Sequence, residues 1–198
     1  MHKVFGVPIK VIDNCPENVL KEAKTVAETE RHKSKLTWYG NMTSTFKDEG
    51  CDVLNICPLL SKYICKNVNE YLIKDLHIRP DNCFDIKFNS SWINYSTKHM
   101  LQEYHMHSDI DISGVFYVNA VPNSGKIFFR NPSPNVLYHK LTFLTDKIDS
   151  EVSYPPVVGR MILWPGYLDH MVTRNMSAGE RISFTFNIKL QENILWKR

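Results

Sequence analysis

The sequence lacks a long apolar run, since nothing in it approaches the roughly 18 consecutive apolar residues of a membrane-spanning helix. Its start, Met1 to Val11, has neither the extended apolar segment nor the small-residue cleavage site of a secretory signal peptide. The five cysteines include no Cys-x-x-Cys pair and are odd in number. These absences predict reduced thiols, no membrane association and a cytoplasmic location.

Blocks of one charge are also missing from the chain. The 24 basic and 21 acidic residues are spread along 198 positions, with a net charge of +3. No aromatic run with interleaved lysine and arginine marks a groove for single-stranded nucleic acid. A nucleic-acid partner is therefore disfavoured, and we expect a small molecule or a peptide as the substrate.

The length suits one domain over residues 1–198, because such a chain buries a core without disulfides or a structural metal. Residues 1–83 read as a supporting region of helices and loops, and residues 84–198 as a β-rich core. Short alternating apolar runs broken by Asn, Pro, Gly and Asp favour a jelly roll there. The expected strands are 84–88, 92–95, 102–107, 113–119, 126–129, 137–144, 159–164 and 181–190.

The supporting region begins with an expected strand over residues 4–12. Pro16 suits the first turn of a helix that ends in the basic residues 31–33, which complement the helix dipole. A second helix with a wide apolar stripe begins near Pro58. Between these helices, residues 34–57 form either an ordered surface loop or the border of a substrate mouth.

The last expected strand has a polar face and an apolar face, because side chains alternate along a strand. The polar face then lines a pocket or meets water, and His170 shortly before it favours the pocket. The polar residues are Arg181, Ser183, Thr185 and Asn187, and the apolar residues are Ile182, Phe184, Phe186 and Ile188.

The tripeptide His107-Ser108-Asp109, with His170 later in the chain, has the composition of a metal site. Two imidazoles and one carboxylate on one face of an ion suit non-haem Fe(II) with open positions for substrates. On a regular strand His107 and Asp109 would share a face. The Pro-Gly turn before His170 can aim that residue across a barrel.

Arg181 lies in an aromatic-flanked strand, where a buried and unpaired guanidinium is unfavourable by about 3–5 kcal/mol. It needs an anion, either an internal carboxylate or the carboxylate of a ligand, and Ser183 on the same face would add a hydroxyl to that carboxylate.

Three segments carry a resemblance to a known family. They are SWINYSTK, QEYHMHSDIDISGVFYVNAVPNSGKIFFRNP and VVGRMILWPGYLDHMVTRNMSAGERISFTFNI. The run from Ser91 to Lys189 resembles the 2-oxoglutarate/Fe(II)-dependent oxygenases, and more closely a phage and bacterial group related to prolyl hydroxylases. For a phage-encoded member the cytoplasm would be that of the host.

This resemblance implies a double-stranded β-helix, a cupin-like jelly roll. It implies an enzyme that uses Fe(II), O2 and the co-substrate 2-oxoglutarate, hydroxylates a substrate and releases succinate and CO2. The implied ligands of Fe(II) are His107, Asp109 and His170, and Arg181 with Ser183 would hold the distal carboxylate of 2-oxoglutarate. Further candidates for co-substrate contacts are Trp92, Asn94 and Tyr117.

The chain departs from its relatives at Ser108, where many carry proline, and His105 is an extra imidazole without an assigned role. A cupin site is an alternative. Its ligands would be His105, His107, Asp111 and His170, and it would serve an isomerase, a ring-cleaving dioxygenase or metal storage. A non-catalytic jelly roll for binding or virion structure is the remaining alternative. For the oxygenase, a prolyl residue is the leading substrate by analogy of fold, and the alternatives are another protein side chain, a free amino acid, a small metabolite or an alkylated base.

Overall fold

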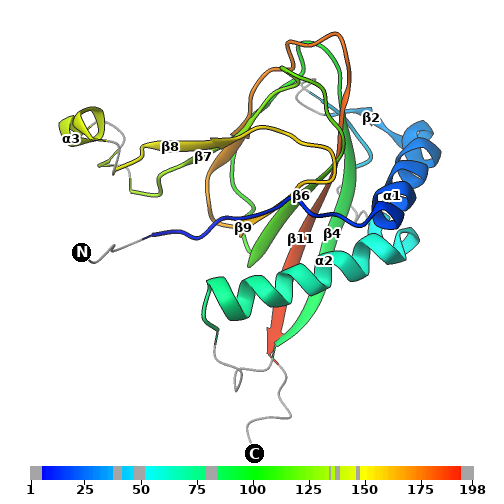
Figure 1. Cartoon of the computed structure of the whole chain (residues 1–198), viewed down its shortest axis with the longest axis horizontal. Helices are drawn as coiled ribbons and strands as arrows, with labels where there is room; N and C mark the ends of the chain where they lie inside the picture. The colour runs from blue at the N-terminus through cyan, green and yellow to red at the C-terminus, as the bar shows by residue number, and fades with distance from the viewer. Residues whose placement is uncertain are drawn as a thin grey trace, which may run out of the picture.

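The computed structural model describes residues 6–37, 42–46, 52–78, 84–133, 135–136, 139–145 and 148–192. Within these ranges the chain forms two antiparallel sheets that face each other, with helices outside the larger one (Figure 1). This arrangement confirms the expected mainly β fold with N-terminal helices, a double-stranded β-helix.

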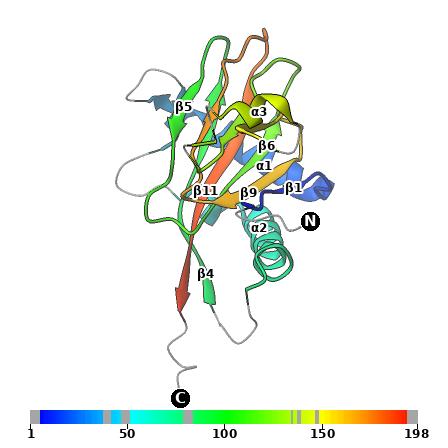
Figure 2. The ribbon, with the colours of Figure 1, turned by 90° about the vertical axis from the view of Figure 1, so that its left-hand side faces the viewer.

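The larger sheet has the strand order β1-β9-β6-β11-β4-β3-β2 and the smaller one β5-β10-β7-β8. Figure 2 shows the long strands β4 and β11 running side by side, and they pair over their whole lengths. The strand bounds are β1 Lys10–Ile12, β2 Lys35–Leu36, β3 Thr43–Ser44, β4 Phe84–Ser96, β5 Gln102–His105, β6 Ile112–Asn119, β7 Ile127–Arg130, β8 Glu151–Tyr154, β9 Met161–Pro165, β10 His170–Val172 and β11 Arg181–Glu192.

Two helices cover the outer face of the larger sheet (Figure 1). Helix α1 spans Glu17–Glu30 and continues into the 3-10 turn η1, Arg31–Lys33, which carries the expected basic end. Helix α2 spans Pro58–Glu70, preceded by η2 (Val53–Ile56) and followed by the π-turn η3 (Tyr71–Asp75). Proline begins α2 as expected, because its missing N–H has no partner in a first helical turn.

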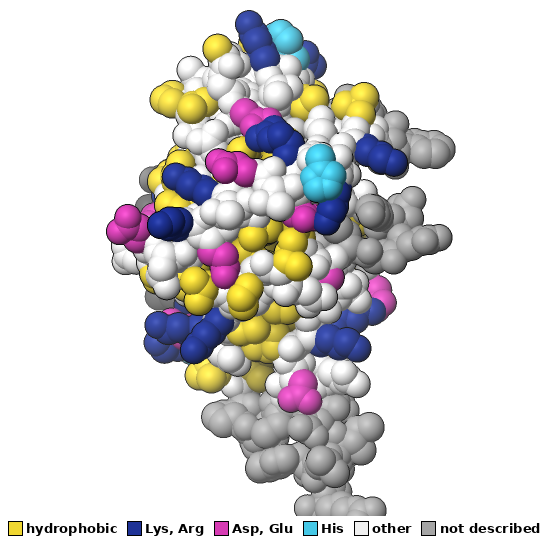
Figure 3. All heavy atoms as spheres, turned by 90° about the vertical axis from the view of Figure 1, so that its right-hand side faces the viewer, with side chains coloured by type: hydrophobic (Ala, Val, Ile, Leu, Met, Phe, Trp, Pro, Cys, Tyr) yellow, Lys and Arg dark blue, Asp and Glu magenta, His cyan; other side chains and the backbone are white. Residues whose placement is uncertain are grey.

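The main core lies between these helices and the larger sheet. Leu60 and Ile64 of α2 are fully buried there against the apolar face of β11, which contributes Phe184 and Phe186. The predicted alternation along β11 is therefore correct. On the helix-covered side of the molecule, Figure 3 shows basic and acidic side chains interspersed around apolar surface.

The segment 137–144 is not a strand, contrary to our expectation. Lys140–Leu144 forms the short helix α3, and the Leu141 amide donates to Nδ1 of His139 at its start. Residues 137 and 138 lie outside the described residues. Figure 1 shows α3 at the end of an extension beyond β7 and β8. A strand needs a neighbouring strand, whereas this short helix finds local partners, since the Thr142 amide also donates to the His139 carbonyl at 3.0 Å.

Strands β8 (Glu151–Tyr154) and β10 (His170–Val172) were not among the strands expected from the sequence. Strand β10 is important for the site, since it pairs with both β5 and β7 and so fixes His170 opposite His105.

Candidate metal and co-substrate site

A cavity of about 920 Å³ opens between the two sheets. Both sheets, with residues from 35–37 and 42–46, supply its walls. The four residues predicted for the polar face of the last strand, Arg181, Ser183, Thr185 and Asn187, line it, as expected for a pocket.

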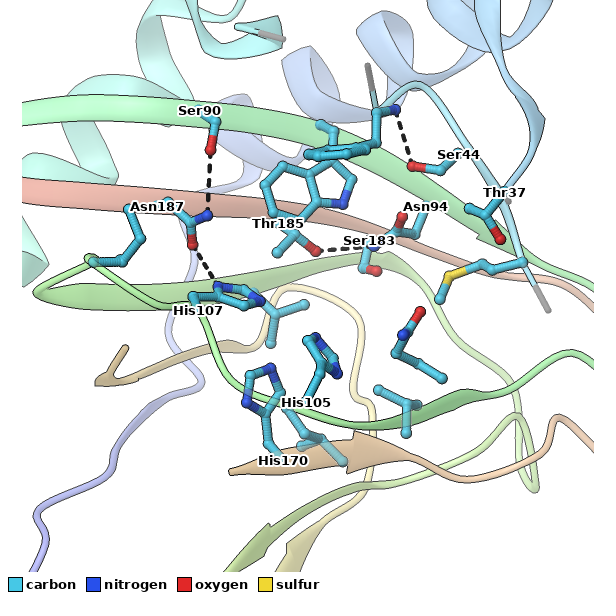
Figure 4. Close-up of a pocket in the computed structure, with 18 of the residues that line it drawn as sticks. Thr37, Ser44, Ser90, Asn94, His105, His107, His170, Ser183, Thr185 and Asn187 are labelled. Carbon is cyan, nitrogen blue, oxygen red and sulfur yellow. Dashed lines mark hydrogen bonds between the residues drawn. The ribbon is translucent and has the colours of Figure 1, made fainter. Parts of the chain in front are cut away.

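Three histidines gather on one wall of this cavity: His105 at the end of β5, His107 in the following loop and His170 at the start of β10. Their ligand nitrogens all lie within 4.8 Å of one another. The ring centroids are 4.3 Å apart for His105 and His170, 5.0 Å for His107 and His170, and 5.2 Å for His105 and His107. Figure 4 shows the three rings pointing toward one another.

The loop between β5 and β6 is held in place by the turn after β9. The His107 amide donates to the Gly166 carbonyl at 3.0 Å, and the Gly166 amide donates to the Asp111 carbonyl at 3.1 Å. A Cβ on Gly166 would lie 2.2 Å from the Ile110 carbonyl oxygen, so only glycine permits this close approach. The Pro-Gly turn therefore connects the loop of His107 with the strand of His170.

Each imidazole uses Nδ1 for a hydrogen bond, which leaves Nε2 for other partners. Nδ1 of His105 lies 2.8 Å from the Glu103 carbonyl, and Nδ1 of His170 lies 2.9 Å from the Leu168 carbonyl. A carbonyl oxygen only accepts, so these Nδ1 atoms carry the proton and the Nε2 atoms carry a lone pair. This is the tautomer that binds a metal through Nε2.

Burial keeps two of these imidazoles neutral at pH 7. Desolvation, followed by the neighbouring His105, lowers the pKa of His107 to about 4. The same causes, in the same order, lower the pKa of His170 to about 3. Because a metal ligand must be unprotonated, the imidazoles of His107 and His170 are ready to bind a cation at neutral pH.

Asp109 does not join this cluster. It lies in a turn with φ of 62°, a left-handed conformation that Asp tolerates, and its side chain is 87% exposed. Its carboxylate forms an ion pair with Lys189. The expectation that His107 and Asp109 share a face assumed a regular strand, but β5 ends at His105. The two residues, two apart, that the structure does bring together are His105 and His107.

Asp111, a ligand in the cupin alternative, is also outside the cluster. Its Oδ2 accepts a hydrogen bond of 2.7 Å from the Leu190 amide. The structure thus brings together the three histidines of that alternative without its carboxylate.

Arg181 is a buried cation that lines the cavity and is 3% exposed. Within the described part of the chain it makes one hydrogen bond, from Nη1 to the Ser124 carbonyl at 2.6 Å, and no ion pair. Desolvation lowers its pKa, and the nearby Tyr117 opposes that effect. Ser183, two residues along the same face, lines the cavity as well. The guanidinium therefore has unused donors where a ligand can enter.

The three weaker candidates also line the cavity. Tyr117 of β6 is 2% exposed, and burial raises its pKa to about 12. Asn94 of β4 donates to the Thr185 hydroxyl at 3.0 Å. Trp92 of β4 lies edge-on to Phe46, with ring centroids 5.0 Å apart.

The segment between the first two helices borders the cavity, which was one of its two expected roles. Lys35 and Leu36 of β2, Met42, Ser44 of β3 and Phe46 line the mouth. Strand β3 pairs with β4 through Thr43 and Ser44, and this pairing holds the segment against the site. Residues 38–41 and 47–51 lie outside the described residues.

The donor set fits a first-row divalent ion. Imidazole ligands suit zinc, copper, iron or nickel, and three of them leave coordination positions for a chelating co-substrate. A buried arginine in the same cavity suits the far carboxylate of a diacid.

The profile of the family described as "Putative 2OG-Fe(II) oxygenase" matches residues 90–187. The chain belongs to the 2-oxoglutarate/Fe(II) oxygenases. It is accordingly a 2-oxoglutarate-dependent non-haem iron oxygenase, with Fe(II), 2-oxoglutarate and O2 as its requirements. No curated protein matches the sequence.

Several solved structures share the fold at low sequence identity. An oxidoreductase of the 2OG-Fe(II) oxygenase family from Burkholderia pseudomallei is 10% identical, with a TM-score of 0.63 over 91% of this chain and 84% of that one. A prolyl-4-hydroxylase from Pseudomonas putida is 12% identical, with a TM-score of 0.60 over 92% of each chain. HygX from Streptomyces hygroscopicus, solved with nickel and 2-oxoglutarate, is 10% identical, with a TM-score of 0.60 over 95% of this chain and 84% of that one.

Among the described residues, no helix combines the length and apolarity needed to span a bilayer.

Proposed function

We propose that this oxygenase hydroxylates an aliphatic C–H bond of a substrate bound in the cavity, with conversion of 2-oxoglutarate and O2 to succinate and CO2. One oxygen atom enters the substrate and the other enters succinate. The bound iron supplies the activation of O2. The observation that carries the proposal is a buried arginine that has no ion partner among the described residues and shares its cavity with three clustered imidazoles.

The metal ligands in this proposal are His105, His107 and His170. The alternative set from sequence replaces His105 by Asp109, whose carboxylate is exposed and paired with Lys189. Asp109 would have to leave that partner and its turn conformation to reach the histidines. The three imidazoles are already assembled, with at least two of their Nδ1 protons held by backbone carbonyls.

Two single variants decide between these ligand sets. We expect His105→Ala to lose Ni(II) binding in a calorimetric titration and Asp109→Asn to keep it. Asp109→Asn is a mild change, because an exposed ion pair contributes only about 0–1 kcal/mol to stability. Loss of Ni(II) binding in Asp109→Asn with retention in His105→Ala would instead assign Asp109 as the ligand.

The 2-oxoglutarate contacts in this proposal are Arg181 and Ser183 at the distal carboxylate. Tyr117, Asn94 and Trp92 are placed to contact the rest of the co-substrate or the substrate. Arg181 supports the diacid because its pairing requirement stays unmet by the described protein groups.

For the substrate we propose a prolyl residue in a peptide, or a free amino acid. The cavity is larger than a five-carbon diacid needs, and Trp92 with Phe46 offers apolar ring surface that suits a pyrrolidine ring. The similar fold of a prolyl-4-hydroxylase is in keeping with this class. A nucleic-acid substrate stays disfavoured on the sequence argument alone.

Activity is tested by supplying Fe(II), 2-oxoglutarate and a proline-containing peptide library, with succinate and peptide mass as readouts. We expect succinate formation and a mass gain of one oxygen at proline. Succinate formation without any mass change at proline would reject the prolyl substrate and keep the oxygenase. Failure to form succinate with any library would count against the proposed reaction.

A further inference from the structure

The imidazole of His107 differs from the other two in what holds its Nδ1 atom. That nitrogen lies 2.6 Å from Oδ1 of Asn187 and 2.8 Å from the hydroxyl of Ser113 (Figure 4 shows the Asn187 contact). The Ser113 hydroxyl donates to the same Oδ1 at 3.0 Å, and Nδ2 of Asn187 donates to the Ser90 hydroxyl at 3.2 Å. Ser113 and Asn187 are 0% and 8% exposed, so water competes little for these bonds.

The amide of Asn187 decides the tautomer of His107. A hydroxyl both donates and accepts, so Ser113 alone fits either tautomer. Oδ1 of Asn187 only accepts hydrogen bonds, and it also accepts one from the Ser113 hydroxyl. The Ser113 hydroxyl has no second proton to donate, so toward His107 its oxygen can only accept. With the amide in this orientation the proton must sit on Nδ1, and Nε2 faces the other two histidines with a lone pair.

We propose that Asn187 is a positioning residue that holds His107 in its metal-binding tautomer and ring orientation. The inference rests on the proposed function, since it takes His107 as a ligand. For the other two histidines a backbone carbonyl does this work, which no side-chain substitution removes. His107 follows the end of β5 and depends on a side chain from β11. The long polar strand thus supports the metal site with Asn187 and faces the co-substrate with Arg181.

The opposite orientation of the amide gives a distinct alternative. Nδ2 would then donate to Nδ1 of His107, and the proton would move to Nε2, where it would block metal binding. The two orientations predict different tautomers in the metal-free protein, so the proposal can be tested before any metal is added.

The experiment records two-bond 1H–15N correlations of the histidine rings in 15N-labelled, metal-free protein at pH 7. In the wild type we expect His107 to carry its proton on Nδ1. In Asn187→Leu we expect a shift toward the Nε2–H form, because Ser113 is then free to donate. Asn187→Asp should restore the Nδ1–H form, since a carboxylate is also an acceptor. Thr185→Val, two positions away on the same face, is the matched control and should leave the tautomer unchanged.

Ni(II) titration of the same variants gives the second readout. Loss of a group that orients a metal ligand lowers metal affinity by about 10–100-fold, so we expect that loss in Asn187→Leu and recovery in Asn187→Asp. An Nε2–H tautomer in the wild type, or wild-type Ni(II) affinity in Asn187→Leu, would overturn the proposal. If His105→Ala retained Ni(II) while the Asn187 variants behaved as expected, the proposed set of three ligands would be wrong, and the role of Asn187 at His107 would stand.

Discussion

Replacing Arg181 by methionine should stabilise the metal-free protein and abolish its response to 2-oxoglutarate. The guanidinium is 3% exposed, without an acidic partner among the described residues. A buried charge without compensation is unfavourable by about 3–5 kcal/mol. Its hydrogen bond to the Ser124 carbonyl returns about 1.5–3 kcal/mol. The difference leaves a net destabilisation of about 2 kcal/mol that methionine removes.

Thermal unfolding measures this effect directly. For a chain of this size 1 kcal/mol shifts Tm by about 2–4 °C, so Arg181→Met should raise Tm by about 4–8 °C. With Ni(II) present, 2-oxoglutarate at 100 times its Kd should stabilise the wild type by about 2.7 kcal/mol. The variant should show no such added shift, because the anchor for the distal carboxylate is gone.

Arg160→Met is a control of opposite sign. Arg160 already has a partner, with Nε 2.6 Å from Oδ1 of Asp13, so its loss should lower stability by up to about 1 kcal/mol. A lower Tm for Arg181→Met in the metal-free protein would show that the protein itself compensates Arg181. A full 2-oxoglutarate shift in Arg181→Met would show that another group binds the diacid.

Three further changes test the packing around the site. Gly125→Ala should weaken 2-oxoglutarate binding and destabilise the fold by more than about 1 kcal/mol. The φ of Gly125 is +95°, and the new Cβ would lie 2.3 Å from the Thr173 carbonyl oxygen and 2.5 Å from Nη1 of Arg181. Calorimetric titration measures the binding and thermal unfolding measures the stability, and wild-type values in either would contradict the prediction. Phe184→Ala should reduce the free energy of unfolding, measured in urea, by about 3–5 kcal/mol, since the ring is fully buried under the helices. A loss under 1 kcal/mol would contradict this, because it would mean that neighbouring side chains fill the cavity left by the ring. Burial raises the pKa of Tyr117 from 10 to about 12. Ionisation of this residue should therefore leave stability unchanged below pH 10. Between pH 10 and 12 it should reduce the free energy of unfolding by about 1.4 kcal/mol per pH unit, because the unfolded chain loses the proton first. Tyr117→Phe should make that alkaline loss shallower in urea unfolding at each pH, and an unchanged slope would contradict the assignment.

Local patterns in the sequence were sufficient for much of the fold. The alternation of β11 predicted which face lines the cavity, because strand geometry has a fixed period of two. Pro58 predicted the start of α2, since a first turn tolerates a missing N–H. The segment 137–144 failed because strand formation depends on a partner strand, which a local pattern does not contain.

The sequence by itself determined the jelly-roll core and the arginine that requires an anion, because these follow from side-chain periodicity, and it determined the family through segments that resemble known members. Only the tertiary structure decided which groups meet. The end of β5 at His105 and the left-handed turn at Asp109 direct the carboxylate outward to Lys189. The pairing of β10 with β5 brings His170 to His105, and Asn187 reaches His107 across 80 positions of sequence. Such contacts depend on backbone direction and strand pairing between distant segments, which no local pattern of residues specifies.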